Sequence, residues 1–211
     1  MDVLGYNLMQ GSVKNIFNGS PFRRALPGVR RRVLLVFAVL CGVAVAYPQN
    51  NDELNQKITD AFKRVYGENV QMDFRQVPLD DSALARVHDL CGSHYGKSVS
   101  LHIAKINNKV AGYGIVDNVR GKEQPITYLV MTGTDLKVKD MEVLYYREAY
   151  GGEIQNQVWR DQFKGKAPGD NLYVGNGVQN ISGATISTNA VSYGVRKLLA
   201  VFQVLRERNL L

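Results

Sequence analysis

The chain has 211 residues, of which 45% are hydrophobic and 21% charged, and this composition excludes a disordered or low-complexity protein. Its two cysteines, Cys41 and Cys91, exclude a disulfide framework and a four-cysteine zinc or iron–sulfur site within the chain. The formal net charge is +7, but six of the 26 basic residues and one of the 19 acidic residues precede Tyr47. The remainder carries only +2, so the charge does not indicate a nucleic-acid partner.

Residues 1–47 have the order of a targeting segment. Arg30-Arg31-Arg32 precede residues 33–47, an uncharged run that spans about 22 Å as a helix, whereas the hydrocarbon core of a bilayer is ~30 Å thick. This length, with small residues at Ala44 and Ala46, favours a cleaved signal peptide. The long basic leader favours a retained membrane anchor, and both remain open. In either case the leader is expected in the cytoplasm, and residues 48–211 in the cell envelope on the extracytoplasmic side, anchored or periplasmic.

Residues 48–97 predict a helix, a strand and a second helix. Apolar residues recur at helical spacing over 51–67, and residues 69–77 alternate as in a strand. Asp80-Asp81-Ser82 can cap a short helix over 83–90 that ends at Gly92.

Four consecutive strands are predicted next, over residues 98–106, 109–116, 125–131 and 136–146. Asn107-Asn108 predicts a two-residue hairpin turn, because asparagine tolerates the left-handed conformation. Residues 117–123 predict a polar loop around Gly121, in which Gly121-Lys122-Glu123 is expected to be solvated. Short links between strands predict an antiparallel β-meander, and helices on both sides of it in the chain predict the α+β class.

The C-terminal part predicts a short helix over 155–163 that carries Trp159, then a glycine-rich connection over 164–180. A long amphipathic helix follows, capped by Ser187, Thr188 or Asn189. Its apolar stripe contains Val191, Val195, Leu198, Leu199, Phe202 and Leu205.

The most informative stretch is residues 180–191, a loop of small residues that leads into the N-terminus of this long helix. Free N–H groups and the positive end of the helix dipole attract a phosphate there, and small residues permit its close approach. The spacing alone therefore indicates either a phosphate-binding turn or an ordinary capped helix.

Residues 182–187, Ser-Gly-Ala-Thr-Ile-Ser, resemble the flavin-attachment motif of FMN-binding domains. These include the covalent-FMN subunits of the sodium-pumping NADH:quinone reductase and of the Rnf electron-transport complex. In that family the threonine hydroxyl is esterified to the FMN phosphate by a flavin transferase outside the cytoplasm. The resemblance implies that Thr185 is the attachment residue, that Ser182, Gly183 and Ala184 shape the turn, and that Ser187 and Thr188 contact the phosphate or cap the helix.

The resemblance extends upstream and covers roughly residues 98–205. Residues 148–154 are similar to the family's Glu-Thr-Pro-Gly-x-Gly segment, and Trp159 with Phe163 and Gly165 matches its Trp-x3-Phe-x-Gly. Glu148, Gly151 and Trp159 are therefore implied in the flavin surroundings, and residues 98–211 are expected to form the FMN-binding core. The chain departs from the family at Ala149 and Tyr150, and at Gln179, where aspartate is usual.

The resemblance implies an exported FMN-binding electron carrier of a membrane redox complex rather than an independent enzyme. A flavin transferase, other redox subunits and the membrane are the expected partners. The alternative is an exported cystatin-like ligand- or protein-binding module without a redox cofactor, which would not need the Thr185 hydroxyl. Glu148 also fits a solvated loop and Trp159 a core position. His88, Cys91 and His94 are too few ligands to predict a metal site.

Overall fold

The computed structural model describes residues 49–211 of the chain. These residues belong to one compact unit. The predicted leader and signal or anchor segment lie outside the described residues. Among the residues that are described, no helix is both long and apolar enough to cross a membrane.

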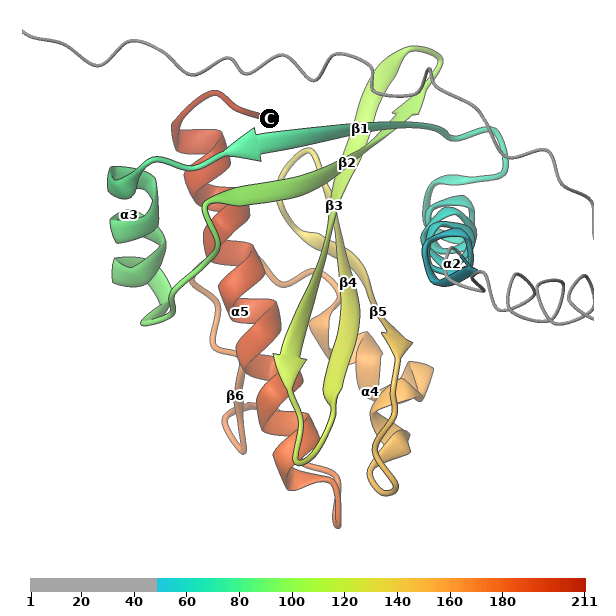
Figure 1. Ribbon diagram of the computed structural model, residues 1–211, viewed down its shortest axis with the longest axis vertical. Coiled ribbons are helices and arrows are strands. Elements are labelled where there is room, and N and C mark those ends of the chain that lie inside the picture. Colours follow the sequence, from blue (N-terminus) through green and yellow to red (C-terminus); the bar gives the residue numbers. More distant parts are fainter. Residues whose placement is uncertain (1–48) are drawn as a thin grey trace, which may run out of the picture. The chain divides into compact units, whose positions relative to one another are not determined.

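The unit is built on a five-stranded antiparallel sheet in which every strand pairs with its neighbour in the sequence (Figure 1). Its strands are β1 (Gln71–Pro78), β2 (Ser98–Ile106), β3 (Lys109–Arg120), β4 (Pro125–Gly133) and β5 (Val138–Tyr145). The predicted meander is therefore confirmed, and the strand of the 48–97 region joins it through β1–β2 pairing. Asn107 and Asn108 both have positive φ, as the predicted hairpin turn requires.

Helices cover both faces of this sheet, which confirms the α+β class. Helices α3 (Asp81–Cys91) and α5 (Thr185–Glu207) pack on one face, where Tyr128 and Val130 of β4 are buried. Helix α2 (Gln49–Tyr66) packs on the other face against Leu129 and Met131 (Figure 1). Successive β4 residues point to opposite faces, so the strand is buried on both sides and reads as a continuous apolar run.

The caps of α3 follow the sequence. The Asp80 carboxylate accepts a hydrogen bond from the Ala83 N–H at 2.7 Å, and Gly92 ends the helix in the left-handed conformation.

The predicted polar loop over residues 117–123 is wrong at its start, because β3 continues to Arg120. Val119 is buried in the core, and Asp117 forms an ion pair with Lys197 of α5 at 2.7 Å. The Asn118 side chain accepts a hydrogen bond from Thr127 across the strand pair at 2.7 Å. Polar residues in this stretch therefore find partners in the sheet and on α5, and only residues 121–124 form the turn.

The predicted helix over 155–163 is three short elements. They are η1 (Gly152–Gln155), α4 (Gln157–Arg160) and η2 (Asp161–Phe163). Asn156 interrupts the helix because it has extended backbone angles and caps the Val158 N–H with its own side chain. The following connection contains two short strands, β6 (Tyr173–Val174) and β7 (Gly177–Val178), that pair with each other.

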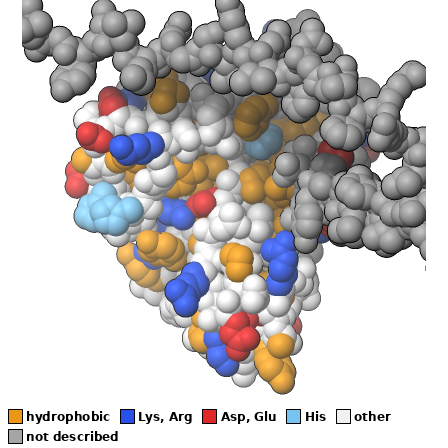
Figure 2. Space-filling model, viewed as in Figure 1, with side chains coloured by type: hydrophobic (Ala, Val, Ile, Leu, Met, Phe, Trp, Pro, Cys, Tyr) orange, Lys and Arg blue, Asp and Glu red, His pale blue; other side chains and the backbone are white. Residues whose placement is uncertain are grey.

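The predicted cap of the last helix at Ser187, Thr188 or Asn189 is also wrong, because α5 already begins at Thr185. A tight turn that bonds the Ala184 N–H to the Ile181 carbonyl, with Gly183 at φ +81°, brings the chain into helical geometry earlier. On the surface of the unit visible in Figure 2, basic and acidic side chains are interspersed with apolar ones.

Candidate functional site

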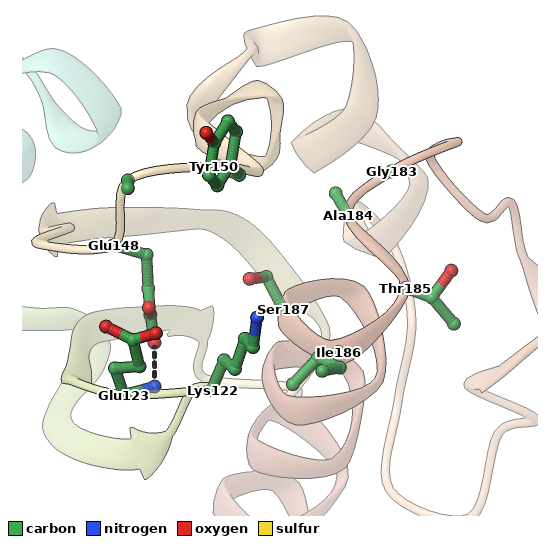
Figure 3. A pocket seen from close by; sticks show the side chains of 10 residues that line it. Lys122, Glu123, Glu148, Tyr150, Gly183, Ala184, Thr185, Ile186 and Ser187 are labelled. Carbon is green, nitrogen blue, oxygen red and sulfur yellow. Dashed lines mark hydrogen bonds between the residues drawn. The ribbon is translucent and has the colours of Figure 1, made fainter.

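A pocket of about 380 Å³ lies where the N-terminus of α5 meets two loops of the sheet (Figure 3). One wall is the turn and first residues of α5, and the others are the β3–β4 turn and the loop after β5. The residues that line it are Lys122, Glu123, Glu148, Ala149, Tyr150, Gly183, Ala184, Thr185, Ile186 and Ser187. The fold thus brings together most of residues 182–187 with the Glu148 loop, which lies more than thirty residues earlier in the chain.

The N-terminus of α5 presents free backbone donors to this pocket. Ala184 occupies the cap position without a side-chain cap, and no acceptor within the described residues receives the N–H groups of Thr185, Ile186 or Ser187. These donors lie at the positive end of a 23-residue helix. Gly183 has no heavy atom within 4 Å of the position a Cβ would take, so the turn is open. The arrangement suits a phosphate group.

The Thr185 side chain is exposed and is held by a local network. Asn180 donates from Nδ2 to the Thr185 hydroxyl at 3.2 Å, and the Thr188 hydroxyl donates to Asn180 Oδ1 at 2.8 Å. Thr188 is fully buried, and its hydroxyl also lies 3.0 Å from the Thr185 carbonyl oxygen. In this structure Thr188 therefore neither caps the helix nor lines the pocket, and it fixes Asn180 behind Thr185.

Ser187 joins α5 to the Glu148 loop. Its hydroxyl lies 3.0 Å from the Tyr146 hydroxyl, and Tyr146 donates to the carbonyl of Tyr150. A Cβ at Gly151 would come within 2.7 Å of the Tyr146 hydroxyl and 3.2 Å of Ala184, and Gly151 has φ +89°. Gly151 does not line the pocket, but only glycine allows this close contact between the loop and the helix.

The Glu148 carboxylate holds the β3–β4 turn in place. Its Oε1 accepts hydrogen bonds from the N–H groups of Glu123 at 2.8 Å and Gln124 at 3.0 Å (Figure 3). A Cβ at Gly121 would lie 2.3 Å from the same oxygen, so the turn can approach Glu148 only with glycine there. These backbone bonds, from Gln124 first and then Glu123, lower the pKa of Glu148, with smaller contributions from the N–H and charge of Lys122.

This lowered pKa makes the closure of the turn pH-dependent. The ionised carboxylate stabilises the turn at every pH above the ordinary glutamate pKa of about 4.3, and this stabilisation is lost as the pH falls through the lower pKa of the folded state. We expect the hydrogen-exchange protection factors of the Glu123 and Gln124 amides, measured by NMR, to fall only on acidification below that range. Glu148→Gln should remove the pH dependence, and an unchanged acid transition in this variant would assign it to another group.

The remaining predicted residues lie outside the pocket lining. Ser182 is exposed on the turn. Trp159 is 6% exposed in the core, where it meets Phe163 edge-on with 5.3 Å between ring centroids. Its Nε1 donates to the Gln179 carbonyl at 2.9 Å, so it holds the backbone that leads into the turn. Gln179 itself is exposed, and its N–H donates to the Gln162 side chain.

Sequence reasoning missed three contributors to this site. The segment 121–123 was expected to be solvated, and Lys122 and Glu123 are exposed, but the sequence did not reveal that they line the pocket. Asn180 was not singled out as the partner of Thr185, nor Tyr146 as the link to Ser187. For Lys122 and Glu123, the available signal was Gly121, a glycine directly before a charged pair in a tight turn. Elsewhere, the His88 and His94 rings stack at 5.0 Å, but no cluster of three metal-ligating side chains occurs among residues 52–211.

The part of the chain that lines the pocket is similar to known proteins. Residues 121–200 match the family described as FMN-binding domain. A subunit of the Na(+)-translocating ferredoxin:NAD(+) oxidoreductase complex from Acetobacterium woodii is 29% identical over 145 residues, which is 62% of this chain and 68% of that protein.

A crystal structure of a subunit of the Na(+)-translocating NADH-quinone reductase from Parabacteroides distasonis is also similar. It is 16% identical with a TM-score of 0.39, over 73% of this chain and 98% of that one. The matched segment 121–200 contains every residue that lines the pocket. Over the segment that contains the pocket, the chain is therefore similar to FMN-binding domains, and its cofactor is FMN.

Proposed function

We propose that this protein is an electron carrier of a membrane redox complex, with its FMN esterified through the phosphate to the hydroxyl of Thr185. The observation that supports this most directly is the position of Thr185, exposed at the first turn of α5 beside backbone N–H groups without acceptors. An exposed hydroxyl is accessible to a flavin transferase, and those N–H groups favour the negatively charged phosphate.

The pocket residues fit the two parts of FMN. The turn at Gly183 and Ala184, with the first N–H groups of α5, would hold the phosphate. Two large apolar side chains on opposite walls, Tyr150 at 84% exposed and Ile186 at 53%, would flank the flat isoalloxazine ring. FMN would supply the electron-transfer chemistry, and the protein would position it and adjust its potential.

The same lining supports a carrier rather than an independent enzyme. The Glu148 carboxylate is occupied by two backbone N–H groups, and its lowered pKa disfavours proton donation near neutral pH. Histidine and cysteine are absent from the pocket lining. The lining would thus serve mainly to bind and orient the cofactor.

The similar proteins support the part of this proposal that concerns a membrane complex. The Acetobacterium woodii protein belongs to a Na(+)-translocating oxidoreductase complex. We infer a corresponding place for this chain, with the domain on the extracytoplasmic side, where a flavin transferase would load it. A covalent link has a physical purpose there, since an unattached cofactor could diffuse away.

The test is to express the full chain with and without a flavin transferase, and to denature the purified protein. We expect visible flavin absorbance to remain with the denatured chain, and its intact mass to rise by one FMN residue, only in the presence of the transferase. FMN that is released on denaturation would rule out the ester but retain FMN binding. Flavin bound in another form, such as FAD, would contradict the proposed cofactor chemistry.

A further inference from the structure

Lys122 is the only positively charged side chain among the ten that line the pocket. It follows the end of β3, and Figure 3 shows its side chain extending toward Ser187 on the first turn of α5. No carboxylate within the described residues lies within 4 Å of its ammonium group. The ammonium therefore forms no ion pair within 4 Å, and its charge acts on the Glu148 carboxylate only at longer range.

The structure holds the backbone of Lys122 in this position. The turn that carries it is fixed by the two hydrogen bonds from Glu123 and Gln124 to Glu148, and by the bond from the Gly121 N–H to the Gln124 carbonyl at 3.0 Å. The Glu148 carboxylate, which lines the same pocket, uses its Oε1 for these backbone donors. The turn thus holds an ammonium group without an ion-pair partner beside the pocket in which we propose that FMN binds.

We propose that Lys122 sets the reduction potential of the FMN bound in this pocket, an inference that rests on the proposed function because it requires FMN at this site. Full reduction adds two electrons and one proton, which leaves one additional negative charge on the ring system. A nearby ammonium group stabilises that charge and makes reduction more favourable. Lys122 would therefore act on the cofactor through its charge alone, and it takes part in no bond-forming step.

The test is an anaerobic titration of the FMN-loaded full chain with dithionite, which supplies the electrons, in the presence of mediator dyes. We expect Lys122→Gln to lower the ratio of reduced to oxidised FMN at a fixed potential by about threefold to tenfold. Lys122→Glu should lower it further, and Lys122→Arg should stay close to the wild type.

Lys109→Gln is the matched control, because it removes the same charge from the opposite end of β3, about 40 Å away along the strand. If Lys122→Gln titrates like Lys109→Gln, the proposal is wrong. It is also wrong if Lys122→Gln lowers the amount of bound FMN while the FMN that remains titrates like the wild type, since Lys122 would then only retain the cofactor. A wild-type chain without FMN in this pocket would instead refute the proposed function.

Discussion

Thr185→Ala should give a folded protein from which all flavin separates on denaturation, and whose intact mass shows no FMN residue even when a flavin transferase is present. The substitution removes the hydroxyl and one methyl group from the first turn of α5, and an ester cannot form without the hydroxyl. The side chain is exposed, and its hydroxyl accepts one hydrogen bond, from Asn180. The fold should therefore lose less than about 1 kcal/mol of stability.

Two further variants separate attachment from binding. Thr185→Ser keeps a hydroxyl at the same position and should retain covalent FMN. Ser182→Ala removes the other exposed hydroxyl of the turn, which does not line the pocket, and should also leave the ester intact. Covalent FMN that persists in Thr185→Ala and disappears in Ser182→Ala would assign the attachment to Ser182.

Gly194→Val should destabilise the domain by about 3 kcal/mol, because α5 approaches the sheet closely at this residue. A Cβ there would lie 2.5 Å from the hydroxyl oxygen of Tyr128 and 2.7 Å from Val119. Tyr128 is fully buried, and its hydroxyl donates to Asp117, so the ring has little freedom to move. Burial, with the Asp117 charge nearby, also raises the pKa of Tyr128, so the hydroxyl stays protonated at neutral pH.

Thermal or urea unfolding of the full chain provides the measurement, and a loss of this size corresponds to a fall in Tm of about 6–12 °C. Gly194→Ala tests whether close contacts of the new Cβ cause the loss of stability. In a helix interior alanine is favoured over glycine by about 1 kcal/mol, so a destabilising effect of this smaller change can come only from the close contacts of the new Cβ. Gly96→Val is the control, because a Cβ at Gly96 meets only the Ser98 carbonyl at 3.9 Å. An equal loss of stability in Gly194→Val and Gly96→Val would contradict the explanation by close packing at Gly194.

The sheet and its helices could be read from the sequence because their signals are local. Residues 98–106 alternate between the faces of the sheet, Asn107 and Asn108 accept positive φ, and Asp80 and Gly92 carry cap chemistry for one short helix. The amphipathic stripe of the last helix likewise fixed which of its sides is buried. Each of these features depends on residues only a few positions apart.

The errors arose where distant contacts outweigh local preference. Three of the four residues 117–120 are polar, which predicted a loop, but Lys197 and Thr127 provide partners that keep this stretch in β3. The helix start at Thr185 depends on the turn at Gly183, and the hydroxyls of Ser187 and Thr188 are used by Tyr146 and Asn180. A pattern of residue types does not reveal these partners.

The sequence by itself determined the antiparallel α+β architecture, the resemblance to FMN-binding domains and the FMN cofactor, because a short motif and local periodicity carry that information. The tertiary structure alone decided which side chains meet at the pocket. It closed the Gly121–Gln124 turn on Glu148, placed Lys122 opposite the first turn of α5, and moved Trp159 and Thr188 into supporting positions in the interior. The physical reason is that most of these contacts join residues about 20 to 65 positions apart, and their geometry is set by how the sheet and α5 pack.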